Sequence, residues 1–227
     1  DTENFTPSFN VTFFIQCFPE LIAKIPFTLW LGVLSFAASF VLAALITVLR
    51  NARIRPVRWI ISVYISFFRS TPYITQLFIF YYGIPQFVPA MRTMTADTAF
   101  VISVALNSSA FITEIIRGGL LSVDKGQKEA AMSVGMNRFQ MMKEIVIPQA
   151  FVSALPALGN SFVGTVKNTA VAFTVGVVEI LSQSKILAAQ GFNYMEAYIA
   201  AGMVYWMLIL VLDFLQKKLE KRACRFL

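Results

Sequence analysis

Long apolar stretches alternate with short polar segments along the chain, and most of the stretches have the length of a membrane span. A helix needs about 20 apolar residues to cross the hydrocarbon core of a bilayer. The pattern predicts an all-α integral membrane protein with five transmembrane helices, at residues 27–49, 57–82, 98–116, 151–166 and 198–215. Arg69, Thr71 and Pro72 fall inside the second stretch, and we expect them to break that helix.

Lysine and arginine residues predict the orientation, because short loops rich in them stay on the cytoplasmic side. They gather in three places that alternate along the predicted topology: Arg50, Arg53, Arg55 and Arg58; Lys125, Lys128, Arg138 and Lys143; and Lys217, Lys218, Lys221, Arg222 and Arg225. The N-terminus is therefore predicted outside and the C-terminus in the cytoplasm. Cys17 and Cys224 would lie on opposite faces of the membrane, where they could not bond to each other within one chain.

Residues 170–181 form an apolar stretch that is too short to span. The chain must cross an even number of times between two cytoplasmic basic segments, and the stretches at 151–166 and 198–215 already supply two crossings. Residues 170–181 are therefore predicted to be re-entrant or interfacial, beside the translocation path. Glu179 in this piece would either face water in a vestibule or contact a cationic substrate.

The polar and apolar pattern also predicts the domain organisation. Phenylalanines interspersed with polar residues make residues 1–26 an amphipathic, extracytoplasmic segment. Residues 27–216 would form a transmembrane domain with a cytoplasmic loop at 121–148. Residues 217–227 would form a basic cytoplasmic tail.

The composition argues against catalysis by this chain. It is 57% hydrophobic and has no histidine, so common metal sites and the base of a serine or cysteine nucleophile lack their residues. It also has no G-x-x-x-x-G-K-[ST] phosphate loop. We expect no metal and no cofactor in the chain itself. The net charge of +7 does not indicate a nucleic-acid partner, because the basic residues flank the predicted spans, where membrane topology and anionic inner-leaflet lipid account for them.

The loop between the third and fourth predicted spans has the pattern of an exposed helical hairpin. Residues 123–134 suit a short helix, Gly135 permits a sharp left-handed turn, and residues 137–145 suit a second helix that returns to the membrane. The small side chains of Ala130 and Ala131 would let a partner approach closely, and the carboxylate of Glu129 would pair with a basic residue of that partner. The residues expected to act in this contact are Lys125, Glu129, Ala130, Ala131, Gly135 and Pro148.

The spacing within this loop is specific. Glu129-Ala130-Ala131 is followed by glycine after six residues, Ile145 ten residues later and Pro148 three later, which resembles the EAA coupling loop of binding-protein-dependent ABC importer permeases. Further stretches resemble the polar amino acid branch: Phe68-Arg69-Ser70-Thr71-Pro72, Gln76-Leu77-Phe78, Tyr81-Tyr82-Gly83-Ile84-Pro85 and Glu114-Ile115-Ile116-Arg117-Gly118-Gly119. The resemblance covers residues 29–222.

This resemblance implies a type I importer fold in a bacterial cytoplasmic membrane. It also implies the partners: two cytoplasmic subunits that bind ATP and Mg²⁺, a second permease chain, identical or related, and an extracytoplasmic solute-binding protein. The substrate would be a polar amino acid, with cystine, a basic amino acid or glutamine all open. Asn168 stands where this branch frequently has aspartate, so a relative's charge preference cannot be transferred to this chain.

Polar groups inside a membrane are costly and mark candidate functional sites. Ser161, Thr165 and Asn168 recur at helical spacing on one face, and Asn107 and Ser108 lie at mid-membrane in the third span. We expect these five residues to bind the substrate's ammonium and carboxylate groups. The alternative is that they hold helices together without touching a ligand.

Charged residues near the spans suggest structural roles. Glu114 and Arg117 have the spacing of a helical ion pair, and Lys167 would extend towards lipid headgroups. Two other function classes remain open at this point: an autonomous channel or secondary transporter, and a scaffolding membrane subunit that does not transport.

Overall fold

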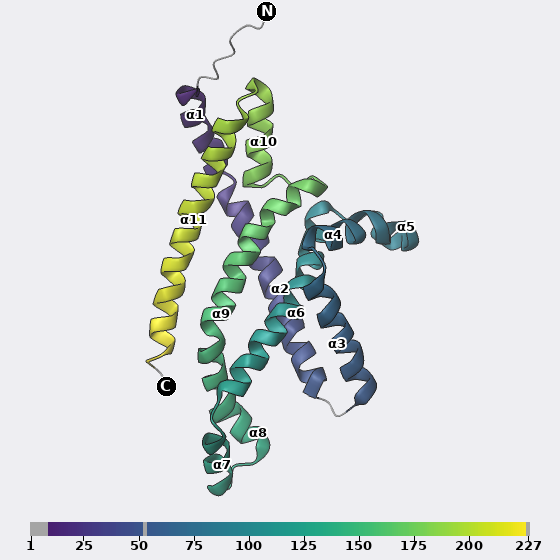
Figure 1. The fold of residues 1–227 in the computed structure, drawn as a ribbon, viewed down its shortest axis with the longest axis vertical. Helices are drawn as coiled ribbons and strands as arrows, with labels where there is room; N and C mark the ends of the chain where they lie inside the picture. Colours follow the sequence, from purple (N-terminus) through teal and green to yellow (C-terminus); the bar gives the residue numbers. More distant parts are fainter. Residues whose placement is uncertain (1–8, 52–53, 226–227) are drawn as a thin grey trace, which may run out of the picture.

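The computed structural model describes residues 9–51 and 54–225, and every regular element in that part is a helix (Figure 1). Within these residues, four stretches are long and apolar enough to cross a membrane: α2 (Ile25–Asn51), α6 (Ala96–Ser122), Arg138–Val175, which contains α9 (Ile147–Asn168), and α11 (Tyr194–Ala223). The predicted all-α fold is therefore confirmed. Residues 1–8 of the predicted N-terminal segment, Arg53 of the first basic cluster and residues 226–227 of the predicted tail lie outside the described part.

The second predicted span is not one continuous helix. α3 (Arg55–Ser70) ends before Thr71 and Pro72, which are both extended, and α4 (Tyr73–Phe78) follows. The predicted break is therefore confirmed, and its physical reason is that proline disfavours helical geometry in the residue before it. The total of five crossings and the orientation stay predictions.

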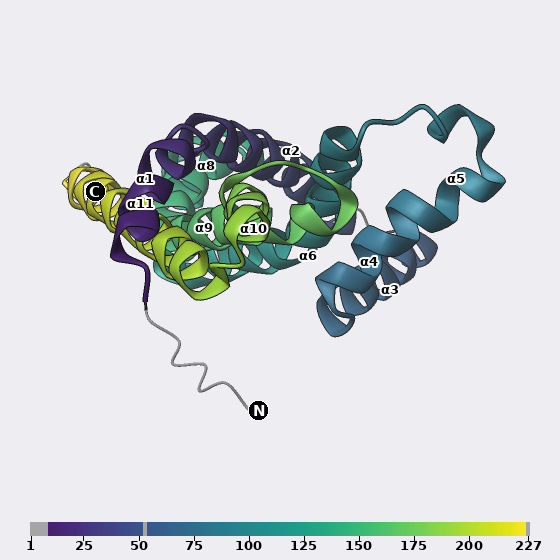
Figure 2. The same cartoon turned by 90° about the horizontal axis from the view of Figure 1, so that it is seen from above.

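After the break, the chain leaves the bundle as an arm. It runs through the π-helical turn η1 (Ile79–Gly83), α5 (Ile84–Phe87) and the 3₁₀ turn η2 (Pro89–Met91) before α6 begins. Figure 2 shows this arm extending to one side of the other helices.

Helix α6 lies at the centre of the bundle, in contact with α2, α3, α4 and α9. Its close approach to α9 depends on Gly119. A Cβ atom at this position would lie 2.5 Å from the backbone oxygen of Ala150, a distance that real side chains do not tolerate. The two helices that carry the predicted substrate residues can therefore cross closely.

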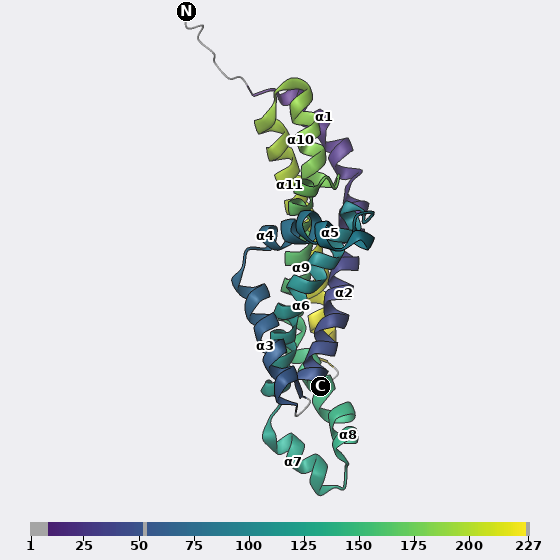
Figure 3. The ribbon, with the colours of Figure 1, turned by 90° about the vertical axis from the view of Figure 1, so that its right-hand side faces the viewer.

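The two ends of the bundle differ. At one end α1 (Val11–Ile22) and α10 (Ile180–Gly191) pack on α11, burying Cys17 and Leu21. At the other end α7 (Lys125–Ser133), α8 (Arg138–Met141) and the π-helical turn η3 (Met142–Val146) project from the bundle (Figure 3). Cys17 is buried at the first of these ends, and Cys224 is exposed just after α11.

The apolar piece at residues 170–181 does not form a spanning helix. It consists of the 3₁₀ helix η4 (Thr169–Val175), a left-handed turn at Gly176 and the start of α10. Both predicted roles of Glu179 are wrong, because its side chain is fully buried. It caps α10 by accepting from the backbone N–H of Ser182 at 2.8 Å, and its other oxygen accepts from the Tyr205 hydroxyl. Glu179 therefore ties the irregular segment to α11.

Candidate functional site

One open cavity of about 500 Å³ lies between α6, α9 and the junction of α3 with α4. All five residues predicted to bind substrate line it, although they come from two helices more than 50 residues apart in sequence. The full lining is Thr71, Tyr73, Asn107, Ser108, Phe111, Ile115, Ala157, Asn160, Ser161, Gly164, Thr165 and Asn168.

Helix α9 supplies the predicted stripe. Ser161, Thr165 and Asn168 share one face, and Asn160, which sequence reasoning did not select, lines the cavity beside them. The Thr165 hydroxyl donates to the backbone oxygen of Ser161 at 3.0 Å, so it meets a ligand only as an acceptor. The signal for Asn160 was its spacing, since Asn160, Gly164 and Asn168 also repeat every four residues.

Helix α6 supplies Asn107 and Ser108, each nearly buried. The Asn107 amide nitrogen donates to the backbone oxygen of Phe68 at 3.1 Å and to the side-chain oxygen of Gln76 at 2.8 Å. Both amide protons are thereby used, and its carbonyl oxygen is left to accept from a ligand. Asn107 therefore has a structural role in addition to the predicted one.

Gln76 is a residue that sequence reasoning used only as part of a motif. Its side-chain nitrogen lies 2.6 Å from the Thr71 hydroxyl and 3.1 Å from the backbone oxygens of Phe68 and Thr71. These acceptors belong to the end of α3, where the helical ladder is interrupted. Gln76 and Asn107 together satisfy the broken helix end that forms one wall of the cavity.

We expect Gln76→Leu to destabilise the protein by roughly 2–3 kcal/mol, because the Thr71 backbone oxygen would lose its side-chain donor and the buried Asn107 amide would lose its acceptor. Thermal unfolding of the purified chain in detergent measures this. Gln86→Leu is the matched control, since Gln86 is exposed and donates to the backbone oxygen of Tyr82 at 2.9 Å. Equal destabilisation by the two changes would contradict the role given to Gln76.

The cavity lining in the described part of the chain contains only uncharged residues. The guanidinium of Arg69 lies outside the lining, 5.6 Å from the ring centroid of the lining residue Phe111. Lys167 is exposed and does not line the cavity. Amides, hydroxyls and a tyrosine ring suit a polar ligand that brings its own compensating charges.

The segment predicted to contact a partner forms two short helices joined at Gly135. Asp124 caps α7 by accepting from the backbone N–H of Gly126 at 2.7 Å, and Gly135 takes a left-handed φ of +85°. Asn137 and Gln140 form a reciprocal capping box at the start of α8, with both bonds 2.9 Å long. These caps fix a rigid hairpin.

The hairpin exposes fewer small residues than predicted. Glu129 and Ala130 are exposed, but Ala131 is buried against its own chain and offers no surface to a partner. Large apolar side chains that the sequence analysis did not select are exposed instead: Met132, Val134 and Phe139. Pro148 lies in the first turn of α9, directly after η3, so the hairpin continues into the helix that carries the stripe.

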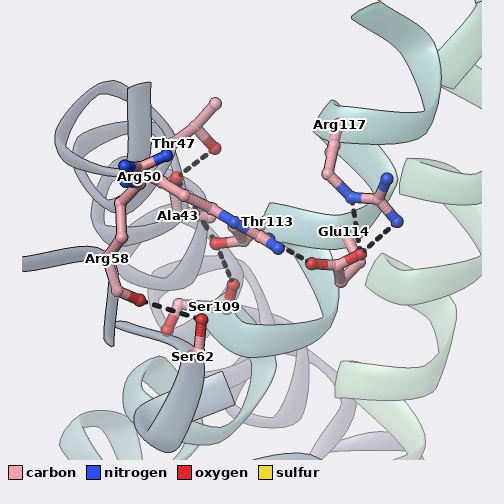
Figure 4. Close-up of polar contacts among 9 residues, drawn as sticks. All are labelled: Ala43, Thr47, Arg50, Arg58, Ser62, Ser109, Thr113, Glu114 and Arg117. Atoms are coloured by element: carbon pink, nitrogen blue, oxygen red, sulfur yellow. Dashed lines mark hydrogen bonds and ion pairs between the residues drawn. The ribbon is translucent and has the colours of Figure 1, made fainter. Parts of the chain in front are cut away.

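Glu114 and Arg117 form the ion pair that their spacing predicts, with an Nη2–Oε2 distance of 2.6 Å (Figure 4). The structure adds a third member, because Arg50 of α2 also donates to Glu114. The ion pair therefore joins α2 to α6. Sequence spacing could not reveal this contact, since Arg50 and Glu114 are 64 residues apart.

Several membrane-length helices around a polar cavity, with a rigid hairpin at one end, define a multi-pass membrane protein of the transport class. Residues 40–224 match the family described as "Binding-protein-dependent transport system inner membrane component". The chain belongs to this family, and within it to the polar amino acid ABC importer permeases.

Individual relatives agree with this assignment. The probable amino-acid permease protein YxeN of Bacillus subtilis (strain 168) is 41% identical over 92% of this chain and 93% of its own length. The L-cystine transport system permease protein TcyL of the same organism is 38% identical over 90% of this chain and 87% of its own. A chain of the solved structure "Crystal structure of an amino acid ABC transporter with histidines" has a TM-score of 0.86 and 33% identity, covering 96% of this chain and all of that one.

Proposed function

We propose that this chain is the permease subunit of an ATP-driven importer that moves a polar amino acid without net charge into the cytoplasm. The observation that carries the proposal is the cavity: five polar residues chosen from sequence converge on it, and its described lining is uncharged. A zwitterionic amino acid needs donors for its carboxylate and acceptors for its ammonium. Asn168 and Ser161 supply donors, and the free oxygens of Asn107 and Thr165 supply acceptors.

The substrate proposed first is cystine, with glutamine second. TcyL is by name an L-cystine permease protein, and both amino acids are polar and carry no net charge at neutral pH. A basic amino acid fits less well, because a cationic side chain in a cavity without a carboxylate would have no partner.

The proposed partners follow from the two ends of the fold. Two cytoplasmic ATP-binding subunits would dock on the α7–α8 hairpins of two permease chains, identical or related. An extracytoplasmic solute-binding protein would deliver the amino acid at the opposite side of a bacterial cytoplasmic membrane. The exposed Met132, Val134 and Phe139 support docking, since large apolar side chains on an exposed hairpin suit a protein interface. The hairpin would pass the movement of the ATPase into α9 as a rigid body.

The experiment that tests this function is uptake by vesicles that contain the chain with its ATP-binding subunits and binding protein. Labelled cystine, glutamine, arginine, histidine and glutamate would be compared, with and without ATP. We expect ATP-dependent uptake of cystine or glutamine above that of arginine and glutamate. Uptake by the chain without the ATP-binding subunits would overturn the importer proposal in favour of a channel or secondary transporter.

Replacing the stripe by the combined variant Ser161→Ala, Thr165→Val and Asn168→Leu should abolish substrate-stimulated ATP hydrolysis while the complex still assembles. These changes remove polar atoms but keep the size of each side chain close to the original. Asn193→Leu is the control, because Asn193 precedes α11 and does not line the cavity. Unchanged stimulation in the triple variant would show that the stripe only packs helices.

A further inference from the structure

A second, basic cavity of about 380 Å³ lies between α2, α3 and α6, near the end from which α7 projects. It is separate from the cavity proposed for the amino acid and shares none of its lining residues. Its lining is Thr47, Arg50, Asn51, Arg58, Ser62, Thr113, Arg117 and Leu120. Figure 4 shows most of these side chains, together with the ion pair of Glu114 with Arg50 and Arg117.

The charge of this cavity is unbalanced. Three guanidinium groups line it, and the carboxylate of Glu114 beside it is already shared by Arg50 and Arg117. Arg58 is exposed, and its backbone oxygen accepts a hydrogen bond from the Ser62 hydroxyl at 2.8 Å. Guanidinium groups bind phosphate oxygens in a fixed, bidentate geometry, so the cavity suits a phosphate better than a single carboxylate.

An apolar groove of about 290 Å³ is continuous with the basic cavity. Thr47, Asn51 and Leu120 line both. From there the groove extends between α2, α6 and α9 as far as Phe40 and Leu158, more than one helical turn deeper into the bundle. Almost all of its lining is apolar: Phe40, Ala44, Val48, Ile116, Met142, Ile147, Ala150, Phe151, Ala154 and Leu158 complete it.

We propose that these two cavities form one binding site for an anionic phospholipid. The phosphate lies among Arg50, Arg58 and Arg117, and an acyl chain lies in the apolar groove. Basic pockets between transmembrane helices on the cytoplasmic side suit anionic headgroups, and the positive clusters of this chain predict that side for this end. A free phosphate would match the arginines but would leave the groove unused.

The position of the site gives it a consequence for transport. The groove touches Met142 of η3 and Ile147 at the start of α9, where the projecting hairpin joins the bundle. The headgroup contacts α2, α3 and α6 at the same end. A bound lipid would therefore brace the joint through which the hairpin moves α9.

The test is thermal unfolding of the purified full chain in detergent, titrated with phosphatidylglycerol, with phosphatidylcholine of the same acyl chains, and with inorganic phosphate. We expect phosphatidylglycerol alone to raise the unfolding temperature. Arg58→Gln should raise the concentration of phosphatidylglycerol needed for half of this shift about tenfold, the loss expected for one charge-assisted hydrogen-bond partner.

Two further variants make the test specific. Arg55→Gln is the matched control on the same helix, because Arg55 is exposed but does not line the cavity. The concentration of phosphatidylglycerol needed for half of the thermal shift should be unchanged in this variant. Ala44→Trp fills the groove and should weaken phosphatidylglycerol binding without touching an arginine. If Arg55→Gln weakens binding as much as Arg58→Gln, general surface charge explains the effect and the proposed site is overturned. An equal rise in unfolding temperature with inorganic phosphate or with phosphatidylcholine would also overturn the proposal. Unchanged phosphatidylglycerol binding in Ala44→Trp would show that no acyl chain lies in the groove, which contradicts the proposed lipid site.

Discussion

Gly135→Val is expected to reduce ATP-driven uptake about tenfold, because a strain of about 1–2 kcal/mol at the turn corresponds to a factor of about 5–30 in the population of the working geometry. Gly135 has a φ of +85°, where a β-branched side chain is strained. The turn is closed by the N–H of Gly135 donating to Met132 at 3.1 Å and that of Met136 donating to Ala131 at 3.1 Å. Valine would displace α7 from its fixed position relative to α8.

The matched variant is Gly135→Asn, because asparagine tolerates the left-handed conformation better than other side chains. We expect it to keep most of the uptake and of the ATPase activity, while Gly135→Val loses both and co-purifies poorly with the ATP-binding subunits. Membrane insertion of the two variants should be equal. Equal transport by the valine and asparagine variants would remove the turn from the coupling mechanism.

Asn168→Asp is expected to change which amino acid is transported. The substitution places a carboxylate in a cavity whose described lining is uncharged. Two opposite charges 4 Å apart attract by about 4 kcal/mol at an effective dielectric constant of about 20. Part of this gain is lost to desolvation of both groups, so we expect uptake of arginine relative to glutamine to rise about tenfold rather than by the full factor.

Uptake competition in the reconstituted vesicles measures this change. Gln190→Glu is the control with the same change of charge, since Gln190 is exposed on α10 and does not line the cavity. If both variants shift selectivity equally, the added negative charge acts through the electrostatic potential of the whole chain rather than through the cavity. If Asn168→Asp leaves the ratio unchanged with transport intact, Asn168 does not contact the substrate side chain.

The sequence predicted the site as two separate groups of polar residues. Ser161, Thr165 and Asn168 could be placed on one face because a helix repeats every 3.6 residues. That Asn107 and Ser108 lie opposite them was a hypothesis, since no local rule relates residues on different helices. The crossing of α6 and α9, which Gly119 makes close, brings the two groups to one cavity.

Local chemistry also predicted the broken second span but not its support. The effect of Pro72 on the residue before it is a property of neighbouring residues, and it ended α3 as expected. The donors that satisfy the broken end come from Gln76 and from Asn107 on α6. Such partners are selected by packing, so their role could not be read from the motif that contains Gln76.

The sequence by itself determined that this protein is a helical membrane permease. Length and hydropathy decide what enters a membrane, and the Glu129-Ala130-Ala131 segment is a local motif followed by a left-handed turn that favours Gly135. The tertiary structure alone decided how the charged groups are used: Glu179 is buried beneath Tyr205, and Arg50 joins Glu114 from another helix. It also placed Arg58 beside an apolar groove. These contacts join residues on different elements, and their energies depend on burial and distance, which exist only once the helices have packed.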